Sequence, residues 1–336
     1  MLPRTMKTVL IASAVAGSLA LAGCSSDGGE TPGDGSGEAD VVSVKIVEFP
    51  IPDFAPVWAA EAQGYFTDEQ LDVSYDEGGV KTSTDAVPLL VSGTYDLALG
   101  AGSSTAQARQ QGLPIQIVVG SSQYGHEDGD DNSIAIIARA DGPESLADLA
   151  AGDVVGVNGL GSATHTYARS AIDQAGADSA ALEYQNVPNQ TAPELVLNGS
   201  VAASTLIEPF LTAALQNPDI KVIGYPSALI ATGTPTLSFV ASESYIADHA
   251  DVIDRFRSAV QSGADWLNDP ANREEALALI AEHTGLPAEL LSNLVLPNYS
   301  TAISPELLAQ QLDLFVDYGV LEQAPPLDEI LATQPE

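Results

Sequence analysis

Short apolar runs alternate with amphipathic segments along most of the chain from residue 42 onward. In the first part of the chain, the runs predict strands at 42–47, 71–75, 95–100 and 115–119. The segments between them predict helices at 57–64, 83–92 and 104–111, each closed by a glycine at or just after its last residue. Strands that alternate with short helices are typical of an α/β protein whose mostly parallel sheet is covered by helices on both faces.

After an apolar run at 134–138, a second series of the same kind begins around residue 146. Its expected strands are 154–157, 182–184, 203–207 and 220–223, and another apolar run follows at 237–241. The expected helices of this series are 162–175, 192–197 and 209–215, and the helical tail comprises 249–268, 273–283, 288–294 and 305–318. The second series therefore lies between the first series and a long helical tail.

This order of elements predicts two lobes joined by two crossings of the chain, near residues 120–134 and 235–246. We expect residues 42–126 and 244–336 to form lobe I and residues 127–243 to form lobe II. A single doubly wound domain is the alternative arrangement. In both arrangements, ligands bind at loops beyond the carboxyl ends of the strands, where helices begin.

The N-terminal segment has the layout of a secretory signal. Arg4 and Lys7 precede an apolar stretch, 9–22, that is shorter than the ~20 residues needed to span a bilayer. The following Leu21-Ala22-Gly23-Cys24 resembles the lipobox of bacterial lipoproteins. We therefore expect residues 1–23 to be a signal peptide and Cys24 to carry acyl chains, palmitate among them. The alternative is an ordinary signal with a chance cysteine.

The composition changes this picture in three ways. Residues 24–41 are rich in Ser, Gly and acidic side chains, which predicts a flexible acidic tether. The formal net charge of the whole chain is −35, from 46 acidic and 11 basic residues, so nucleic acid is an unfavourable partner. Cys24 is the single cysteine, which excludes a disulfide within the chain and a cysteine zinc cluster.

Several short sequences in the folded part follow one another in a characteristic order. They are Phe54-Ala55-Pro56, Gly64-Tyr65-Phe66, Leu71-Asp72-Val73, Asp96-Leu97-Ala98, Gly112-Leu113-Pro114, Ser145-Leu146-Ala147-Asp148-Leu149, Val155-Gly156-Val157, Gly161-Ser162 and Glu208-Pro209. Together they resemble the substrate-binding proteins of ABC importers for nitrate, sulfonates, taurine and thiamine-pyrimidine precursors. The chain departs from that family at Gln70, where a glycine is usual, and at Ala202, where an aspartate is common.

The resemblance implies a two-lobe clamp of the periplasmic-binding-protein type (type II) with a ligand cleft. It implies an exported binding protein that captures a small organic molecule containing nitrogen or sulfur and closes about a hinge. The implied partners are the permease subunits of an ABC importer and, through the lipid, the outer face of the cytoplasmic membrane. We expect a monomer without a cofactor. The resemblance does not identify the ligand.

Two expected helix starts carry small hydroxyl residues after a strand. They comprise Gly161, Ser162, Ala163 and Thr164 in lobe II, and Ser103, Ser104 and Thr105 in lobe I. Free N–H groups at a helix start favour an accepting ligand group, and the hydroxyls add donors. Simple capping of the helices is the alternative.

Further candidates come from the resemblance and from charge. In the family, the loop that contains Phe54, Ala55 and Pro56 contributes to the cleft, and His165 is a possible neighbour of the ligand. Glu208, at the end of an expected strand, would bind a ligand amine, ring N–H or hydroxyl, which disfavours nitrate. The alternative for Glu208 is favourable charge at a helix start.

Metal binding and catalysis have weaker support. Residues 126–132, His-Glu-Asp-Gly-Asp-Asp-Asn, lack the spacing of an EF-hand, so we expect a solvated loop and no metal site. The chain has no Gly-x-Ser-x-Gly, His-Glu-x-x-His or phosphate-loop motif, so an enzyme is not expected. A membrane-tethered enzyme or a ligand sensor on the same fold remains the alternative function.

Overall fold

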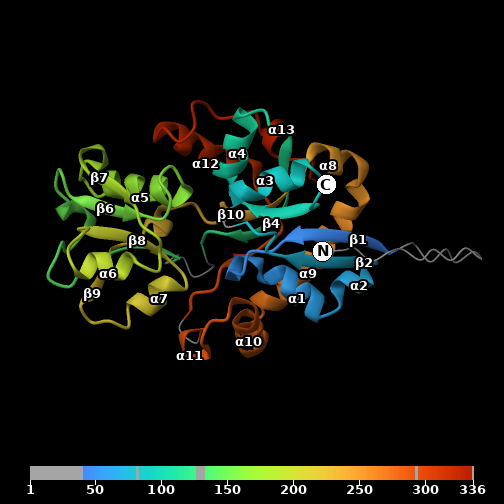
Figure 1. The fold of residues 1–336 in the computed structure, drawn as a ribbon, viewed down its shortest axis with the longest axis horizontal. Helices are drawn as coiled ribbons and strands as arrows, with labels where there is room; N and C mark the ends of the chain where they lie inside the picture. The colour runs from blue at the N-terminus through green and yellow to red at the C-terminus, as the bar shows by residue number, and fades with distance from the viewer. Residues whose placement is uncertain (1–40, 81–82, 126–132, 292–293, 335–336) are drawn as a thin grey trace, which may run out of the picture. The chain divides into compact units, whose positions relative to one another are not determined.

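The computed structural model describes residues 41–80, 83–125, 133–291 and 294–334 (Figure 1). The expected signal peptide, Cys24, nearly all of the tether and the acidic loop 126–132 lie outside these residues. Residues 40–336 form one compact unit, which contains two β-sheets. Among the described residues, no helix combines the length and the apolar character needed to cross a bilayer.

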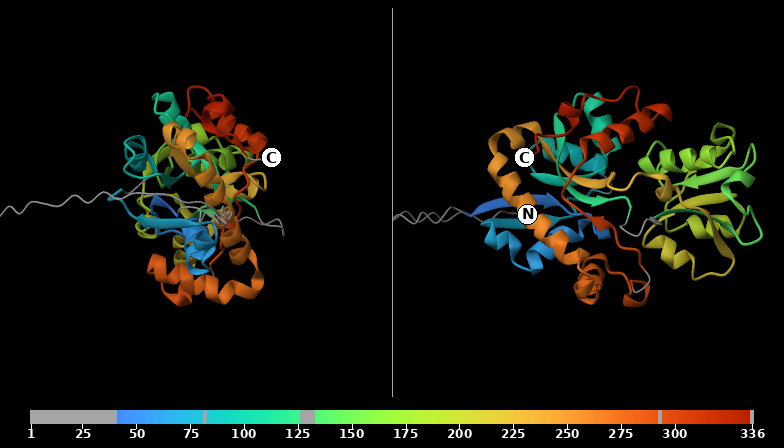
Figure 2. Two further views of the ribbon diagram at one scale, coloured as in Figure 1. Left: turned by 90° about the vertical axis from the view of Figure 1, so that its right-hand side faces the viewer. Right: turned by 180° about the vertical axis from the view of Figure 1, so that it is seen from behind.

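The first sheet has six strands in the order β11-β4-β10-β3-β1-β2. Their bounds are β1 Val42–Val47, β2 Leu71–Asp76, β3 Leu97–Gly100, β4 Ile115–Gln123, β10 Pro235–Ser242 and β11 Asn298–Tyr299. Successive strand residues point to opposite faces, so Leu97 and Leu99 enter one core and Ala98 the other. Figure 2 shows helices on both faces of this sheet.

The helices of the first lobe divide between these two cores. One core contains α1 Ala55–Ala62, α2 Tyr65–Asp68, α9 Ala250–Asn268, α10 Arg273–Thr284 and α11 Ala288–Leu291. The other core contains α3 Ser83–Val91, α4 Gly102–Gln110, α12 Pro305–Asp317 and α13 Leu327–Ile330. A short helix, α8 Glu243–Asp248, follows β10. The helices after β10 therefore pack in the cores of the first sheet.

The second sheet has five strands in the order β7-β6-β8-β5-β9. Their bounds are β5 Ile134–Arg139, β6 Val154–Val157, β7 Glu183–Asn186, β8 Ala203–Ile207 and β9 Ile220–Gly224. One core of this lobe contains α5 Ala163–Gln174, and the other contains α6 Ala192–Leu197 and α7 Phe210–Ala214. The described residues thus form an α/β fold with two lobes, and each lobe has a sheet with helices on both faces.

Most strands of each sheet run in one direction, and strands of opposite direction accompany them. β10 is inserted between β3 and β4, and β5 is inserted between β8 and β9, while β11 lies antiparallel to β4 at the edge of the first sheet. Both inserted strands belong to the segments where the chain changes lobe. The expected division assigns residues 235–243 to lobe II, but β10 pairs within the first sheet, so the second crossing precedes residue 235.

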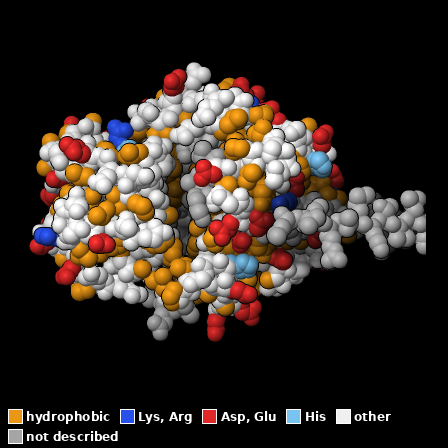
Figure 3. Space-filling model, in the orientation of Figure 1, with side chains coloured by type: hydrophobic (Ala, Val, Ile, Leu, Met, Phe, Trp, Pro, Cys, Tyr) orange, Lys and Arg blue, Asp and Glu red, His pale blue; other side chains and the backbone are white. Residues whose placement is uncertain are grey.

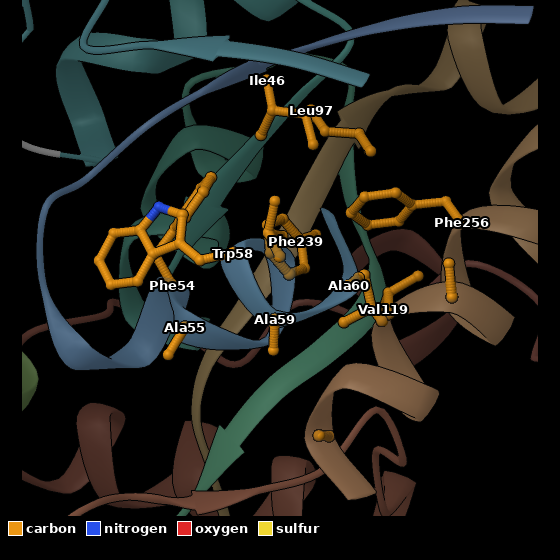
Figure 4. Close-up of a cluster of buried hydrophobic side chains, with 14 of the residues drawn as sticks. Ile46, Phe54, Ala55, Trp58, Ala59, Ala60, Leu97, Val119, Phe239 and Phe256 are labelled. Atoms are coloured by element: carbon orange, nitrogen blue, oxygen red, sulfur yellow. The ribbon is translucent and has the colours of Figure 1, made fainter. Parts of the chain in front are cut away.

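A close contact between α1 and α9 fixes the start of α1. A Cβ atom added to Gly263 of α9 would lie 2.3 Å from the carbonyl oxygen of Pro56 and 3.0 Å from the backbone nitrogen of Ala60. Nearby, the rings of Phe54, Phe239 and Phe256 fill the core between these helices and the sheet (Figure 4). The glycine therefore lets two helix backbones touch directly, just after the loop that reaches the cleft described below.

Gln70 has a backbone conformation that favours glycine. Its φ angle is 56°, in the left-handed region, at the turn between α2 and β2. This is the position where the family that the sequence resembles usually has glycine. The departure from that family therefore places a side chain on a backbone that most residues avoid.

Candidate ligand-binding cleft

A cleft of about 620 Å³ lies between the two lobes. Figure 3 shows the surface hollowed between the two lobes. From the first lobe, the lining includes Ile51, Pro52, Asp53, Ala101, Ser103, Ser104, Gln107, Gln123, Tyr124, Thr236, Leu237, Val295, Pro297 and Asn298. From the second lobe, it includes Ser133, Ile134, Asn158, Gly159, Leu160, Gly161, Ser162, Ala163, Thr164, Ile207 and Glu208. The volume suits a small organic molecule.

The structure brings part of the expected site together at this cleft. The expected residues that border it are Ser103, Ser104, Gly161, Ser162, Ala163, Thr164 and Glu208. The remaining ones, Phe54, Ala55, Pro56, Thr105 and His165, are not among the described residues that line it. Contact between the bordering residues and a ligand stays a prediction.

The loop before α1 reaches the cleft with other residues than those expected. The sequence predicts a helix start at residue 57, but a 3₁₀ turn, η1 Pro52–Phe54, already begins the helical path. This turn directs Phe54 into the core, where its ring lies 5.5 Å from that of Trp58. Ala55 and Pro56 are buried as well. The neighbouring Asp53 borders the cleft in their place.

Asp53 is held by two serines at the end of β4. The hydroxyl of Ser122 donates to Oδ1 of Asp53 at 2.5 Å, and the hydroxyl of Ser121 donates to the Asp53 carbonyl oxygen at 2.6 Å. Burial raises the pKa of the Asp53 carboxyl group, and the hydrogen bond from Ser122 opposes this rise. Asp53 is thus a carboxylate that hydrogen bonds hold in place at the cleft. The sequence signal for it is an acidic residue beside Pro52, in the first turn of a helix.

Glu208 occupies the corresponding position in the second lobe, directly after β8. Its carboxylate accepts hydrogen bonds from the Thr212 hydroxyl at 2.8 Å and the Thr212 backbone N–H at 3.1 Å. The backbone N–H of Val295, in the first lobe, also donates to it. Burial raises the pKa of Glu208, while these hydrogen bonds oppose the rise. Glu208 therefore both caps the turn that follows it and touches the opposite lobe.

Helix α5 begins at the cleft with a capped first turn. The Ser162 hydroxyl accepts from the His165 backbone N–H at 3.2 Å and donates to the Asn158 carbonyl oxygen at 3.1 Å. The capping role that the sequence leaves open for Ser162 is therefore present. Ala163 and Thr164 border the cleft, and their backbone N–H groups belong to the first turn of α5, before the capped N–H of His165.

Helix α4 begins at the cleft in a different way. The hydroxyls of Ser104 and Thr105 donate to the Ala101 carbonyl oxygen at 2.9 and 3.1 Å. Ala101 precedes the helix and provides no side-chain cap. Thr105 is buried, and its hydroxyl points back to the Ala101 carbonyl oxygen, so Thr105 does not line the cleft. The start of α4 therefore presents backbone N–H groups and the side chains of Ser103 and Ser104.

His165 stabilises the loop before α5 and does not line the cleft. Its Nδ1 accepts a hydrogen bond from the Gly161 backbone N–H at 3.0 Å, and its ring lies 4.6 Å from that of Tyr184. Burial and the nearby Arg169 guanidinium lower the pKa of His165, which favours the neutral ring. The histidine thus fixes the glycine-rich loop that carries Leu160.

Side chains outside the cleft also join the two lobes. Nε2 of Gln311 in α12 donates to the Tyr167 hydroxyl of α5 at 2.6 Å. Two residues further along α5, the Arg169 guanidinium lies 4.9 Å from the Tyr318 ring centre and donates to the Tyr318 carbonyl oxygen at 3.0 Å. These contacts hold α5 against the C-terminal part of the first lobe.

The electrostatic character of the cleft comes from acids and neutral polar groups. Asp53 and Glu208 are its two carboxylates among the described residues, and no described lysine, arginine or histidine lines it. Serine hydroxyls and the amides of Gln107, Asn158 and Asn298 complete the polar lining. The described residues contain no group of three or more His, Cys, Asp or Glu side chains that could hold a metal ion.

Comparison with known proteins identifies the family. The family described as NMT1/THI5 like matches residues 51–273, more than half of the chain. The chain belongs to the NMT1/THI5-like family. The family match, together with the sulphonate-binding and nitrate-binding proteins among the solved structures of similar fold, confirms the resemblance. The matched range contains both carboxylates and both helix starts of the cleft.

Relatives of this NMT1/THI5-like chain include binding proteins for several solutes. The riboflavin-binding protein RibY of Chloroflexus aurantiacus is 24% identical over 283 residues, which cover 83% of this chain and 75% of the relative. The periplasmic aliphatic sulphonate binding protein SsuA of Escherichia coli has a TM-score of 0.72 and 19% identity, covering 88% of this chain and 92% of that one. The periplasmic nitrate-binding protein NrtA of Synechocystis PCC 6803 has a TM-score of 0.67 and 13% identity, covering 87% and 86%. These structures establish the two-lobe binding-protein fold.

Proposed function

We propose that this NMT1/THI5-like protein is the extracytoplasmic solute-binding component of an ABC importer. One observation carries the proposal: a cleft of about 620 Å³ to which each lobe contributes a helix start and a carboxylate. Such a cleft can surround a small organic molecule and hold it by polar groups on both sides. The related binding proteins, for riboflavin, aliphatic sulphonates and nitrate, support the same role. The captured molecule is then passed to the permease subunits.

The proposed mechanism is closure of the lobes on the ligand. A ligand between the starts of α4 and α5 contacts both lobes only when they are close, so it shifts the population toward the closed state. The two segments where the chain changes lobe act as the hinge. The contact between Glu208 and Val295 and the bonds between α5 and α12 resist opening. Binding proceeds without chemical change of the ligand.

Small-angle X-ray scattering tests this mechanism on the purified monomer. Riboflavin is the first probe because a relative that covers most of the chain is a riboflavin-binding protein. Saturation should decrease the radius of gyration, and the recovered ligand should be unchanged by mass spectrometry. A scattering curve identical with and without bound ligand contradicts closure, and conversion of the ligand contradicts a pure binding role.

Lipid anchoring at Cys24 is the second part of the proposal. Two acyl chains on one residue anchor a protein stably, whereas a single chain gives only weak membrane binding. Expression of the full chain with Cys24→Ser should therefore move the protein from the membrane fraction to the soluble exported fraction. The wild-type chain, expressed in parallel and labelled with palmitate analogues, should incorporate label and stay membrane-bound. Label in the Cys24→Ser chain, or equal membrane binding of both, argues against this anchor.

A further inference from the structure

We propose that the cleft selects an uncharged or cationic ligand that offers N–H or O–H donors to Asp53 and Glu208, and that it rejects oxyanions such as sulfonates, nitrate and phosphate esters. This inference rests on the proposed binding function and names the ligand class of the same cleft. It separates this chain from structural relatives that bind nitrate and aliphatic sulphonates, although the fold is the same.

The charges around the cleft favour this ligand class. The starts of α4 and α5 each supply about half a positive charge, so together they contribute about one. Asp53 and Glu208 supply two negative charges when both are ionised. The described lining provides no lysine, arginine or histidine to offset them. With both carboxylates ionised, the net charge at the cleft is therefore about one negative charge. This charge repels an anion and attracts a cation or a hydrogen-bond donor.

The carboxylates also have unused acceptor capacity. A carboxylate can accept about four hydrogen bonds. The described side chains give Asp53 one, from Ser122 at 2.5 Å, in addition to contact with its own backbone. Glu208 receives two from Thr212 and one from the backbone of Val295. Neither forms an ion pair with a described basic side chain, so a ligand donor would supply the missing partner. Asp53, with fewer bonds, is expected to make the stronger contact.

Apolar residues of the cleft indicate the character of the rest of the ligand. Leu160 lies on the turn between Gly159 and Gly161, and 57% of its surface is exposed although it borders the cleft. Ile51 and Leu237 line the first-lobe side. An exposed leucine at a cleft edge gains stability when a ligand covers it. The ligand therefore has an apolar body between its donor groups, as a heterocycle with hydroxyl or amino substituents does.

Matched pairs of probes test the selection directly. Riboflavin and FMN share one ring system, and thiamine and thiamine monophosphate share another, but the second member of each pair carries an added phosphate. MOPS and nitrate serve as further anions. Affinities are measured by thermal shift and calorimetry on the chain from residue 25 onward and on the variants Asp53→Asn and Glu208→Gln. Asp72→Asn and Glu183→Gln change exposed carboxylates on outer strands and are the controls.

The expected result is binding of the unphosphorylated member of a pair, with its phosphate ester at least about tenfold weaker. Asp53→Asn and Glu208→Gln should each lower the affinity for the unphosphorylated ligand about tenfold. They should also reduce the difference in affinity between that ligand and its phosphate ester. The affinities of the control variants should stay within about twofold of the wild-type values. Equal or tighter binding of an anion overturns the inference but leaves the binding function intact. Unchanged affinity in both cleft variants also overturns it. A panel without any binding overturns the proposed function, and the inference with it.

Discussion

Gly263→Ala should destabilise the protein by about 1–3 kcal/mol, although alanine is normally the better helix former by about 1 kcal/mol. The added Cβ atom would lie 2.3 Å from the Pro56 carbonyl oxygen, and the clash is with backbone that cannot rotate away. Helices α1 and α9 would have to separate. Because the loop that carries Asp53 leads directly into α1, the separation should also weaken ligand binding.

Denaturant unfolding of the folded region measures this change. Asp265→Ala is a suitable control because residue 265 is exposed in the same helix, where the substitution raises helix propensity and removes one exposed hydrogen bond from Gln261. The control should keep or slightly increase the free energy of unfolding. Equal stability of Gly263→Ala and the wild-type chain would show that α1 and α9 do not touch as closely as described.

Asp53→Asn should increase stability at neutral pH while it weakens binding. Burial raises the folded-state pKa of Asp53 above its ordinary value of 3.8. The folded protein then holds the proton more tightly than the unfolded chain, so stability falls as pH rises from about 3.8 through the raised pKa. Asparagine lacks this penalty but can keep a hydrogen bond with Ser122. We expect a gain of about 1–3 kcal/mol at pH 7 and none below the unfolded pKa.

Thermal or urea unfolding between pH 3 and pH 8 checks the sign. The difference in unfolding free energy between Asp53→Asn and the wild-type chain should grow as pH rises and then level off. Asp72→Asn, at an exposed position of β2, should give a curve parallel to the wild type. A gain that is largest at low pH would mean that the carboxylate is stabilised by its surroundings, and would remove one basis for its proposed role in the cleft. If Asp53→Asn is more stable but binds the ligand more weakly, then the wild-type carboxylate lowers stability in exchange for ligand binding.

The elements of the fold were largely predictable because both series have strong periodic patterns. The strands 42–47, 154–157 and 203–207 and the helix 192–197 agree with β1, β6, β8 and α6 in both bounds. Strand β11, with only two residues, and the short helix α8 have patterns too brief to detect. Pairing is a different problem. The apolar run at 237–241 coincides with most of β10, but nothing in the run shows that β10 inserts between β3 and β4.

The candidate site was predictable where backbone groups define it. Helix starts follow from glycine and serine after a strand, and those of α4 and α5 do border the cleft. The prediction of which residues before α1 line the cleft was wrong by a few positions, because η1 already begins the helical path at Pro52. In a helix each residue is rotated by about 100° from the one before it, so this early start changes which side chain faces the cleft. Asp53 was overlooked for this reason, and Phe54, which is apolar and conspicuous, lies in the core.

The insertion of β10 has a consequence for how the chain matures. The second sheet is built from one continuous stretch, 134–224, whereas β4 reaches β3 only through β10, which the ribosome makes more than a hundred residues later. The second lobe can therefore fold first, while the strands of the first lobe that are already synthesised still have unpaired edges. A fragment ending at residue 230 would keep every strand of the second sheet and leave the first sheet divided. Secretion before β10 emerges would thus move a chain whose first sheet is still incomplete.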